Sequence, residues 1–131
     1  MILLDTQVLV RLNYSPDKLS RAARRAIARE SSKGLGISSI TLWELAMVVE
    51  RGRFRFHAGT TRDFVDGLVQ TPGLAILEIT TEVAVLAAQF PADFPGDPAD
   101  RLIAATARAH QLPLVTSDER IQKSPLVQTI W

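Results

Sequence analysis

Acidic residues of this chain stand where apolar segments end or where helices are predicted to begin. Asp5 directly follows the apolar residues 2–4, and Asp118 follows the mostly apolar residues 112–116. Because the carboxyl ends of parallel strands meet at one edge of a sheet, acids in such places can converge. The acids that could bind a metal or take part in catalysis are Asp5, Glu44, Asp97, Asp100 and Asp118.

Converging carboxylates predict a metal site. Two like charges about 4 Å apart repel by roughly 4 kcal/mol at an effective dielectric constant of 20, and a divalent cation relieves that repulsion. The chain has no cysteine and only two histidines, His57 and His110, so its hard oxygen ligands favour Mg²⁺ or Mn²⁺. The chemistry that suits such a site is metal-assisted phosphoryl transfer or phosphodiester hydrolysis.

Strands alternate with helices in the hydrophobic pattern, which predicts the α/β class with a mostly parallel central sheet. Such sheets are covered by helices on both faces. The predicted strands span residues 2–4, 35–39, 74–79, 112–116 and 127–130. The predicted helices span residues 8–14, 19–31, 39–49, 61–71, 81–90 and 98–110, with a turn or short helix at 118–122.

Composition limits the classes of protein. The 131 residues are the size of one domain, so we predict a single domain over residues 1–131. The net charge of +1 gives no bulk signal of nucleic-acid binding, and the absence of cysteine excludes a disulfide framework and a thiolate zinc site. No apolar stretch of about 18 residues predicts a membrane span. The first residues lack the basic region of a signal peptide, so we expect a cytoplasmic protein.

Each acid also has a purely structural interpretation. Asp97 before Pro98 is a good helix N-cap, and Asp100 at the third helical position favours the helix dipole. Asp118 can cap a C-terminal turn, and Glu44 can lie on a solvated helix face. Asp5 is the hardest to explain structurally, because a buried carboxylate without a partner is costly.

Four ordered blocks of the sequence resemble the PIN domain, and in particular the VapC toxins of type II toxin–antitoxin systems. The blocks are Leu3-Leu4-Asp5-Thr6, the segment 38–45 around Glu44, Asp97-Pro98-Ala99-Asp100-Arg101 with its following helix, and the segment 114–118 ending in Asp118. The resemblance implies a three-layer α/β/α fold and a Mg²⁺- or Mn²⁺-dependent endoribonuclease. Hydrolysis by a metal-activated water would leave 5′-phosphates. The resemblance assigns metal binding and catalysis to Asp5, Glu44, Asp100 and Asp118.

The resemblance also implies supporting residues and partners. Thr6 and Thr116 match hydroxyl positions beside the acids, and Asp97 matches a signature residue that caps the helix or supports the site. The partners implied are an RNA substrate, a VapB-like antitoxin and a second copy of the chain in a homodimer. The predicted helix 39–50 is a candidate antitoxin surface.

An acidic pocket that admits RNA needs cations around its rim. The candidates are Arg11, Arg51, Arg53, Arg55 and Arg101, and Arg101 could instead pair with Asp100. Phe54 and Phe56, which alternate with arginines, could offer stacking surfaces for bases.

Other classes of protein remain open from the residues alone. An aspartyl-phosphate phosphatase would need a second acid two residues after Asp5, where this chain has Gln7. A receiver-type signalling domain would need paired acids early in the chain and a lysine after a late strand. A non-catalytic PIN-like binding module would keep the fold without the activity, and only an activity assay separates it from a nuclease.

Overall fold

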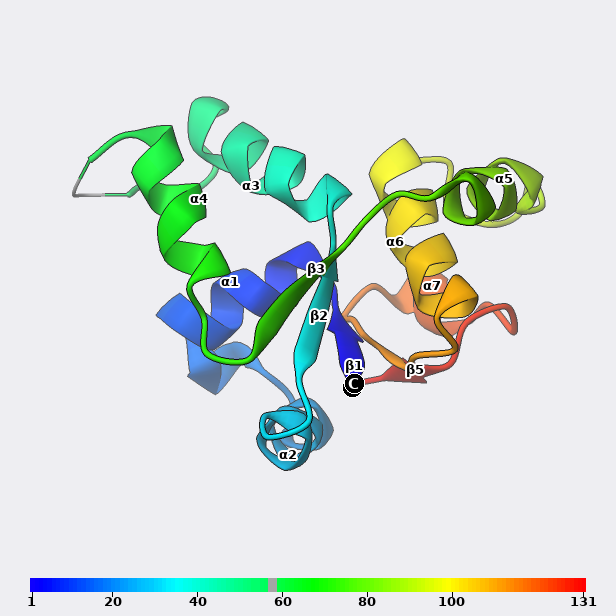
Figure 1. Ribbon diagram of the computed structural model, residues 1–131, viewed down its shortest axis with the longest axis horizontal. Helices are drawn as coiled ribbons and strands as arrows, with labels where there is room; N and C mark the ends of the chain where they lie inside the picture. Colours follow the sequence, from blue (N-terminus) through cyan, green and yellow to red (C-terminus); the bar gives the residue numbers. More distant parts are fainter. Residues whose placement is uncertain (57–58) are drawn as a thin grey trace.

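A parallel sheet between two layers of helices organises the chain in the computed structural model (Figure 1). The structure describes residues 1–56 and 59–131, so His57 lies outside the described residues. Within those ranges the sheet has five strands, β1 (Ile2–Leu4), β2 (Leu35–Ser38), β3 (Leu74–Leu77), β4 (Leu114–Val115) and β5 (Thr129–Ile130). Their order is β3-β2-β1-β4-β5, and every neighbouring pair is parallel. This confirms the predicted α/β class and three-layer architecture.

Helices from the two halves of the chain lie on opposite sides of the sheet (Figure 1). The first side holds α1 (Thr6–Tyr14), a 3₁₀ turn η1 (Pro16–Lys18), α2 (Arg21–Glu30), α3 (Ile40–Glu50) and α4 (Thr61–Val69). The second holds α5 (Thr81–Gln89), α6 (Pro98–Ala109) and α7 (Glu119–Gln122). No helix in the described part of the chain is both long and apolar enough to cross a membrane.

The central strand β1 feeds two hydrophobic cores, one on each face of the sheet. Ile2 and Leu4 belong to the core that includes Phe64 of α4, whereas Leu3 belongs to the core that includes Ile103 of α6. Successive side chains of a strand point to opposite faces, so a strand covered on both sides has to be apolar throughout. This burial explains why the run before Asp5 contains no polar residue.

Four of the five strands, β2 to β5, are shorter than predicted, and β3 and β4 end where their partners end. The predicted strand 74–79 stops at Leu77, which pairs with Ser38, the last residue of β2. The predicted strand 112–116 contracts to β4, whose Val115 pairs with Leu4 at the end of β1. Residues 53–56, which alternate in sequence, form no helix or strand.

Side-chain caps set the starts of α1 and α6, whereas α3, which carries Glu44, begins after Ser39 without a side-chain cap. Asp5 accepts a 2.7 Å hydrogen bond from the backbone N–H of Thr6, so α1 begins two residues earlier than predicted. Asp97 accepts a 3.0 Å bond from Ala99 N–H, and Pro98 occupies the first turn of α6. The sheet and these caps together bring the ends of β1 and β4 and the starts of α3 and α6 to the same edge of the sheet.

Candidate active site

The predicted acids meet in one pocket at the carboxyl edge of the sheet. Asp5 follows β1 and Asp118 follows β4, and these two strands are neighbours. Glu44 comes from α3 and Asp100 from α6, which pack against each other. Together with Asp97 they line a pocket of about 380 Å³. Its other lining residues are Thr6, Gln7, Val48, Arg53, Ser117 and Arg120.

Asp5 is held by two donors from different elements. Its Oδ1 accepts the Thr6 N–H, and its Oδ2 accepts a 2.7 Å hydrogen bond from the hydroxyl of Thr116. The same Thr116 hydroxyl accepts the backbone N–H of Asp118 at 3.1 Å. Burial raises the pKa of Asp5, and the two hydrogen bonds partly offset that rise. Thr116 therefore orients both acids that follow the paired strands.

Glu44 is tied to the first turn of α1. Its Oε1 accepts a 2.5 Å hydrogen bond from the hydroxyl of Thr6, and that hydroxyl also lies 3.2 Å from the hydroxyl of Thr41. Thr6 and Thr41 are both buried. Burial raises the pKa of Glu44, and the nearby charges of Asp5 and Asp97 raise it further. Glu44 therefore faces the pocket instead of lying on a solvated face.

Asp100 is disfavoured as a free carboxylate by its burial and by its acidic neighbours. Its side chain is 16% exposed. Burial is the largest cause that raises its pKa to about 7, and the surrounding carboxylates, with Asp97 and Asp5 foremost, add to the rise. A cation bound beside Asp100 would stabilise its ionised form.

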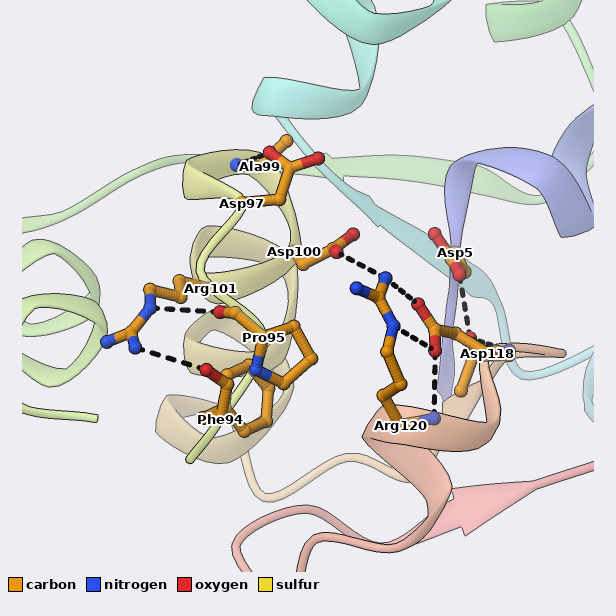
Figure 2. Close-up of polar contacts among 10 residues, drawn as sticks. Asp5, Phe94, Pro95, Asp97, Ala99, Asp100, Arg101, Asp118 and Arg120 are labelled. Atoms are coloured by element: carbon orange, nitrogen blue, oxygen red, sulfur yellow. Dashed lines mark hydrogen bonds and ion pairs between the residues drawn. The ribbon is translucent and has the colours of Figure 1, made fainter. Parts of the chain in front are cut away.

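Asp118 is paired with a cation that the sequence analysis overlooked. Arg120 donates from Nη2 to Asp118 Oδ2 at 2.7 Å and from Nε to Asp118 Oδ1 at 3.2 Å (Figure 2). The Nη2 atom also lies 3.5 Å from Asp100 Oδ2. Hydrogen bonding from Arg120 lowers the pKa of Asp118, whereas the pKa of Asp100 is raised. The pKa values of the two acids that share this guanidinium are therefore shifted in opposite directions.

Asp97 combines both interpretations given to it from the sequence. It caps α6 through Ala99 and it also lines the acidic pocket. Figure 2 shows it at the start of the helix, above Asp100. Its contribution to the pocket is the charge that raises the pKa of Asp100 and Glu44.

The donor set of the pocket fits a hard divalent cation. All five acids offer oxygen, and their burial and mutual repulsion favour the arrival of a positive charge. Among residues 1–56 and 59–131, however, no three His, Cys, Asp or Glu side chains are grouped so that they could hold one ion. The carboxylates are engaged instead by hydroxyls and by the guanidinium described above. Departure of the guanidinium from Asp118 and Asp100 would free these two carboxylates for an ion, while the hydroxyls keep Asp5 and Glu44 in place.

Arg101 has a role different from the expected RNA contact. Its guanidinium donates to the carbonyl oxygens of Phe90 at 2.8 Å, Pro91 at 3.0 Å, Phe94 at 3.3 Å and Pro95 at 3.0 Å. Figure 2 shows it directed away from the acids. These hydrogen bonds hold the loop between α5 and α6 against α6, and they engage the N–H groups of the guanidinium. The cation beside Asp100 is therefore Arg120, not Arg101.

Basic residues border the acidic pocket on the side of α1. Arg53 lines it, and also lines an adjoining pocket of about 330 Å³ together with Arg11 and Lys18. Arg51 and Arg53 line a third pocket of about 160 Å³ with Trp43 of α3. Arg55 is exposed.

The phenylalanines between these arginines are packed into the molecule. The ring centroid of Phe54 lies 5.3 Å from that of Phe64, and the Phe56 centroid lies 5.4 Å from it. Both rings pack against the core on the first side of the sheet. This packing gives Phe54 and Phe56 a structural role in place of the stacking surface considered from the sequence.

A comparison with protein-family models matches residues 2–125 to the PIN domain. The chain belongs to the PIN domain family. The chain is 37% identical over 132 residues to Ribonuclease VapC22 of Mycobacterium tuberculosis, an alignment that covers 99% of this chain and 98% of the relative. The resemblance deduced from the four sequence blocks is thereby confirmed.

Solved structures share this PIN fold over nearly the whole chain. VapBC2 from Rickettsia felis, bound to a DNA fragment from its promoter, has a TM-score of 0.73 and 21% identity, covering 98% of this chain and 97% of that one. DNA-bound VapBC from Salmonella typhimurium has a TM-score of 0.68 at 23% identity, covering 98% and 97%. FitAcB from Neisseria gonorrhoeae has a TM-score of 0.64 at 26% identity, covering 98% and 96%.

Sequence reasoning missed several polar residues at or beside this PIN domain site, among them Arg120, Lys18 and Thr41. Arg120 stands two residues after Asp118, a spacing that allows a helix-start aspartate to bond both the backbone and the side chain. Lys18 precedes the second helix, and only the 3₁₀ turn places it beside Arg11. Thr41 lies three residues before Glu44 on α3, close to Thr6. The Arg120 spacing was a usable signal, whereas the other two depend on tertiary contacts.

Proposed function

We propose that this chain is a divalent-metal-dependent endoribonuclease and the toxin of a VapBC-type toxin–antitoxin system. The observation that carries the proposal is the single pocket lined by Asp5, Glu44, Asp100 and Asp118. The 37% identical relative named Ribonuclease VapC22 supports RNA as the substrate. An RNA substrate would place the protein in the cytoplasm.

The four acids divide the work of holding a cation. Asp5, Glu44 and Asp100 would hold one Mg²⁺ or Mn²⁺, and Asp118 would complete the cluster or bind a second ion. When bound, such a cation lowers the pKa of a water molecule and offsets the negative charge that develops on the phosphate. Hydrolysis by water leaves a 5′-phosphate and a 3′-hydroxyl, and it does not use the 2′-hydroxyl of the RNA as a nucleophile.

The residues around the acids orient them. The Thr116 hydroxyl fixes the rotation of the Asp5 carboxylate, and the Thr6 hydroxyl does the same for Glu44. Asp97 holds the start of α6, which positions Asp100 one turn further on. Ligand groups held by a supporting shell keep their geometry when the cation and substrate arrive.

The basic pocket beside α1 offers a path for the RNA backbone. Arg11, Arg53 and Lys18 line one wall of the pocket that adjoins the acids, so they would bind the phosphates next to the scissile bond. Arg51 and Arg55 lie further along the same exposed segment and would extend the contact. These cations offset the repulsion between the acidic pocket and the RNA.

The structural relatives support one protein partner, an antitoxin. Several of them are toxin–antitoxin complexes, so a VapB-like antitoxin is the partner we propose for this chain. Trp43 on α3, which is 54% exposed beside the acidic pocket, offers the antitoxin an apolar contact. We also propose a homodimer, which light scattering on the purified protein would test.

Cleavage of total cellular RNA by the purified protein tests the nuclease proposal. Reactions contain EDTA, Mg²⁺ or Mn²⁺, and they compare the wild-type protein with Asp5→Ala and with Asp66→Asn, a surface control on α4. We expect metal-dependent cuts at discrete sites with 5′-phosphate ends, lost in Asp5→Ala and kept in Asp66→Asn. Silence of folded, antitoxin-free protein in every condition would favour a non-catalytic binding module, and equal cleavage by Asp5→Ala would refute the assignment of Asp5.

A further inference from the structure

A cation that belongs to the chain itself already stands among the pocket acids. The guanidinium of Arg120 makes two hydrogen bonds to Asp118, at 2.7 and 3.2 Å, and the Nη2 atom that makes the shorter one is 3.5 Å from Asp100 (Figure 2). Both carboxylate oxygens of Asp118 are thus occupied by protein donors. A ligand that needs these oxygens has to compete with the guanidinium.

The local fold of α7 does not need this guanidinium. Asp118 caps α7 through the backbone N–H of Arg120, which donates to Oδ1 at 2.9 Å. A substitution of the side chain leaves that backbone bond in place. The Arg120 side chain is also 67% exposed, so no core packing depends on it. Its most specific contacts are the two acids of the pocket.

The guanidinium also has a place to go when it leaves the acids. Arg120 also lines a second pocket of about 240 Å³ together with Asp93 and Lys123. Asp93 is exposed and offers a carboxylate there. This pocket gives the exposed guanidinium space beside another carboxylate once it leaves Asp118.

We propose that Arg120 is a built-in counter-ion that a divalent cation must displace from Asp100 and Asp118. This inference rests on the proposed metal site. In the metal-free protein the guanidinium offsets the repulsion among the acids and thereby stabilises the fold. In the metal-bound protein it has to leave, so its ion pairs count against metal affinity. Arg120 therefore sets the cation concentration at which the pocket fills.

Calorimetric titration with Mn²⁺ alone, without RNA, tests this role directly. The proteins compared are the wild type, Arg120→Gln, Arg120→Lys and the control Arg62→Gln, which removes the exposed pair of Arg62 with Asp66 on α4. We expect Arg120→Gln to bind Mn²⁺ about tenfold more tightly than the wild type, which equals about 1.4 kcal/mol. Arg120→Lys should lie between them, because its ammonium keeps the charge but not the two-point contact.

The second readout is the unfolding temperature in EDTA, which does not depend on catalytic activity. In the absence of metal, Arg120→Gln should unfold at a lower temperature than the wild type. Saturating Mn²⁺ should reduce this difference in unfolding temperature. Arg62→Gln should match the wild type in Mn²⁺ affinity.

Equal or weaker Mn²⁺ binding by Arg120→Gln would overturn the inference while leaving the nuclease proposal intact. If Arg120→Gln weakened only RNA binding, the guanidinium would be a phosphate contact and the inference would also fail. Absence of Mn²⁺ binding in both the wild type and Arg120→Gln would overturn the metal site itself, and this inference with it.

Discussion

The hydroxyl of Thr116 donates a 2.7 Å hydrogen bond to Oδ2 of Asp5, which joins two residues 111 positions apart in the chain. The bond exists because β1 and β4 are neighbours, with Leu4 paired to Val115 immediately before it. Thr116 is fully buried, so water cannot replace its hydroxyl easily. One of the two donors that orient Asp5 is therefore a hydroxyl that directly follows a neighbouring strand.

Replacing Thr116 with valine removes this donor while keeping the branched shape. We expect Mn²⁺ affinity and RNA cleavage at pH 7 to fall about tenfold or more, because a hydrogen bond to a charged group contributes about 1.5–3 kcal/mol. The loss also raises the pKa of Asp5 further, since this bond lowers it. Thr116→Ser keeps the hydroxyl and should retain both properties. Calorimetry measures the Mn²⁺ affinity and a cleavage assay measures the activity. Equal values for Thr116→Val and Thr116→Ser would contradict the prediction.

The stability of the metal-free protein should decrease as the pH rises from about 4 to about 7. Asp100 titrates from its ordinary value of 3.8 when the chain is unfolded, whereas burial and neighbouring acids raise its pKa to about 7 in the fold. Between these values the unfolded chain loses a proton that the folded protein keeps, so the free energy of unfolding falls by up to about 1.4 kcal/mol per pH unit. Below pH 4 Asp100 is protonated in both states, so the free energy of unfolding no longer changes with pH because of this group.

Urea unfolding in EDTA across this pH range measures the slope. Asp5 and Glu44, whose pKa values are also raised, act in the same direction. The pKa of Asp118 is lowered, so its contribution changes only at more acidic pH. Asp100→Asn should flatten the curve, because its amide does not titrate. A variant with the wild-type slope would show that other groups control the pH dependence.

Arg101 should matter for stability and not for RNA binding. Arg101→Ala removes a charged donor from four carbonyl oxygens of the loop between α5 and α6, so the free energy of unfolding should fall by about 2–3 kcal/mol. Arg101→Lys should recover part of the loss, because an ammonium cannot reach all of the carbonyls. Denaturant unfolding gives the stability, and fluorescence anisotropy with labelled RNA gives the affinity. Weaker RNA binding by a folded Arg101→Ala protein would restore the contact expected from the sequence.

The basic pocket beside α1 should supply salt-dependent RNA affinity. Arg11→Ala and Arg53→Ala should each weaken binding of single-stranded RNA, and each lost phosphate contact should reduce the slope of log K against log salt by about 0.7. Anisotropy in EDTA, which prevents metal-dependent cleavage, measures both quantities. Arg62→Ala on α4 carries the same change of charge outside the pocket and should behave as the wild type. Equal slopes for the pocket variants and this control would exclude this path for the RNA.

The amino-acid sequence by itself determined the class of fold. Buried apolar runs such as residues 2–4 and 35–38 alternate with amphipathic helices, and this alternation produces a parallel sheet covered on both faces. The position of the acids at strand ends followed from the same pattern, since an apolar strand ends where a charged residue emerges. The boundaries were less predictable, because β3 and β4 end where their partners β2 and β1 end.

The tertiary structure alone decided which partners each charged side chain has. Arg101 and Arg120 are both arginines close in sequence to a pocket acid, yet one fastens a loop and the other stands between Asp100 and Asp118. Local sequence does not distinguish them, because the choice depends on where carbonyls and carboxylates from distant segments come to lie. Hydrogen bonds and ion pairs act over a few ångströms, so only the packing of the helices on the sheet assigns them.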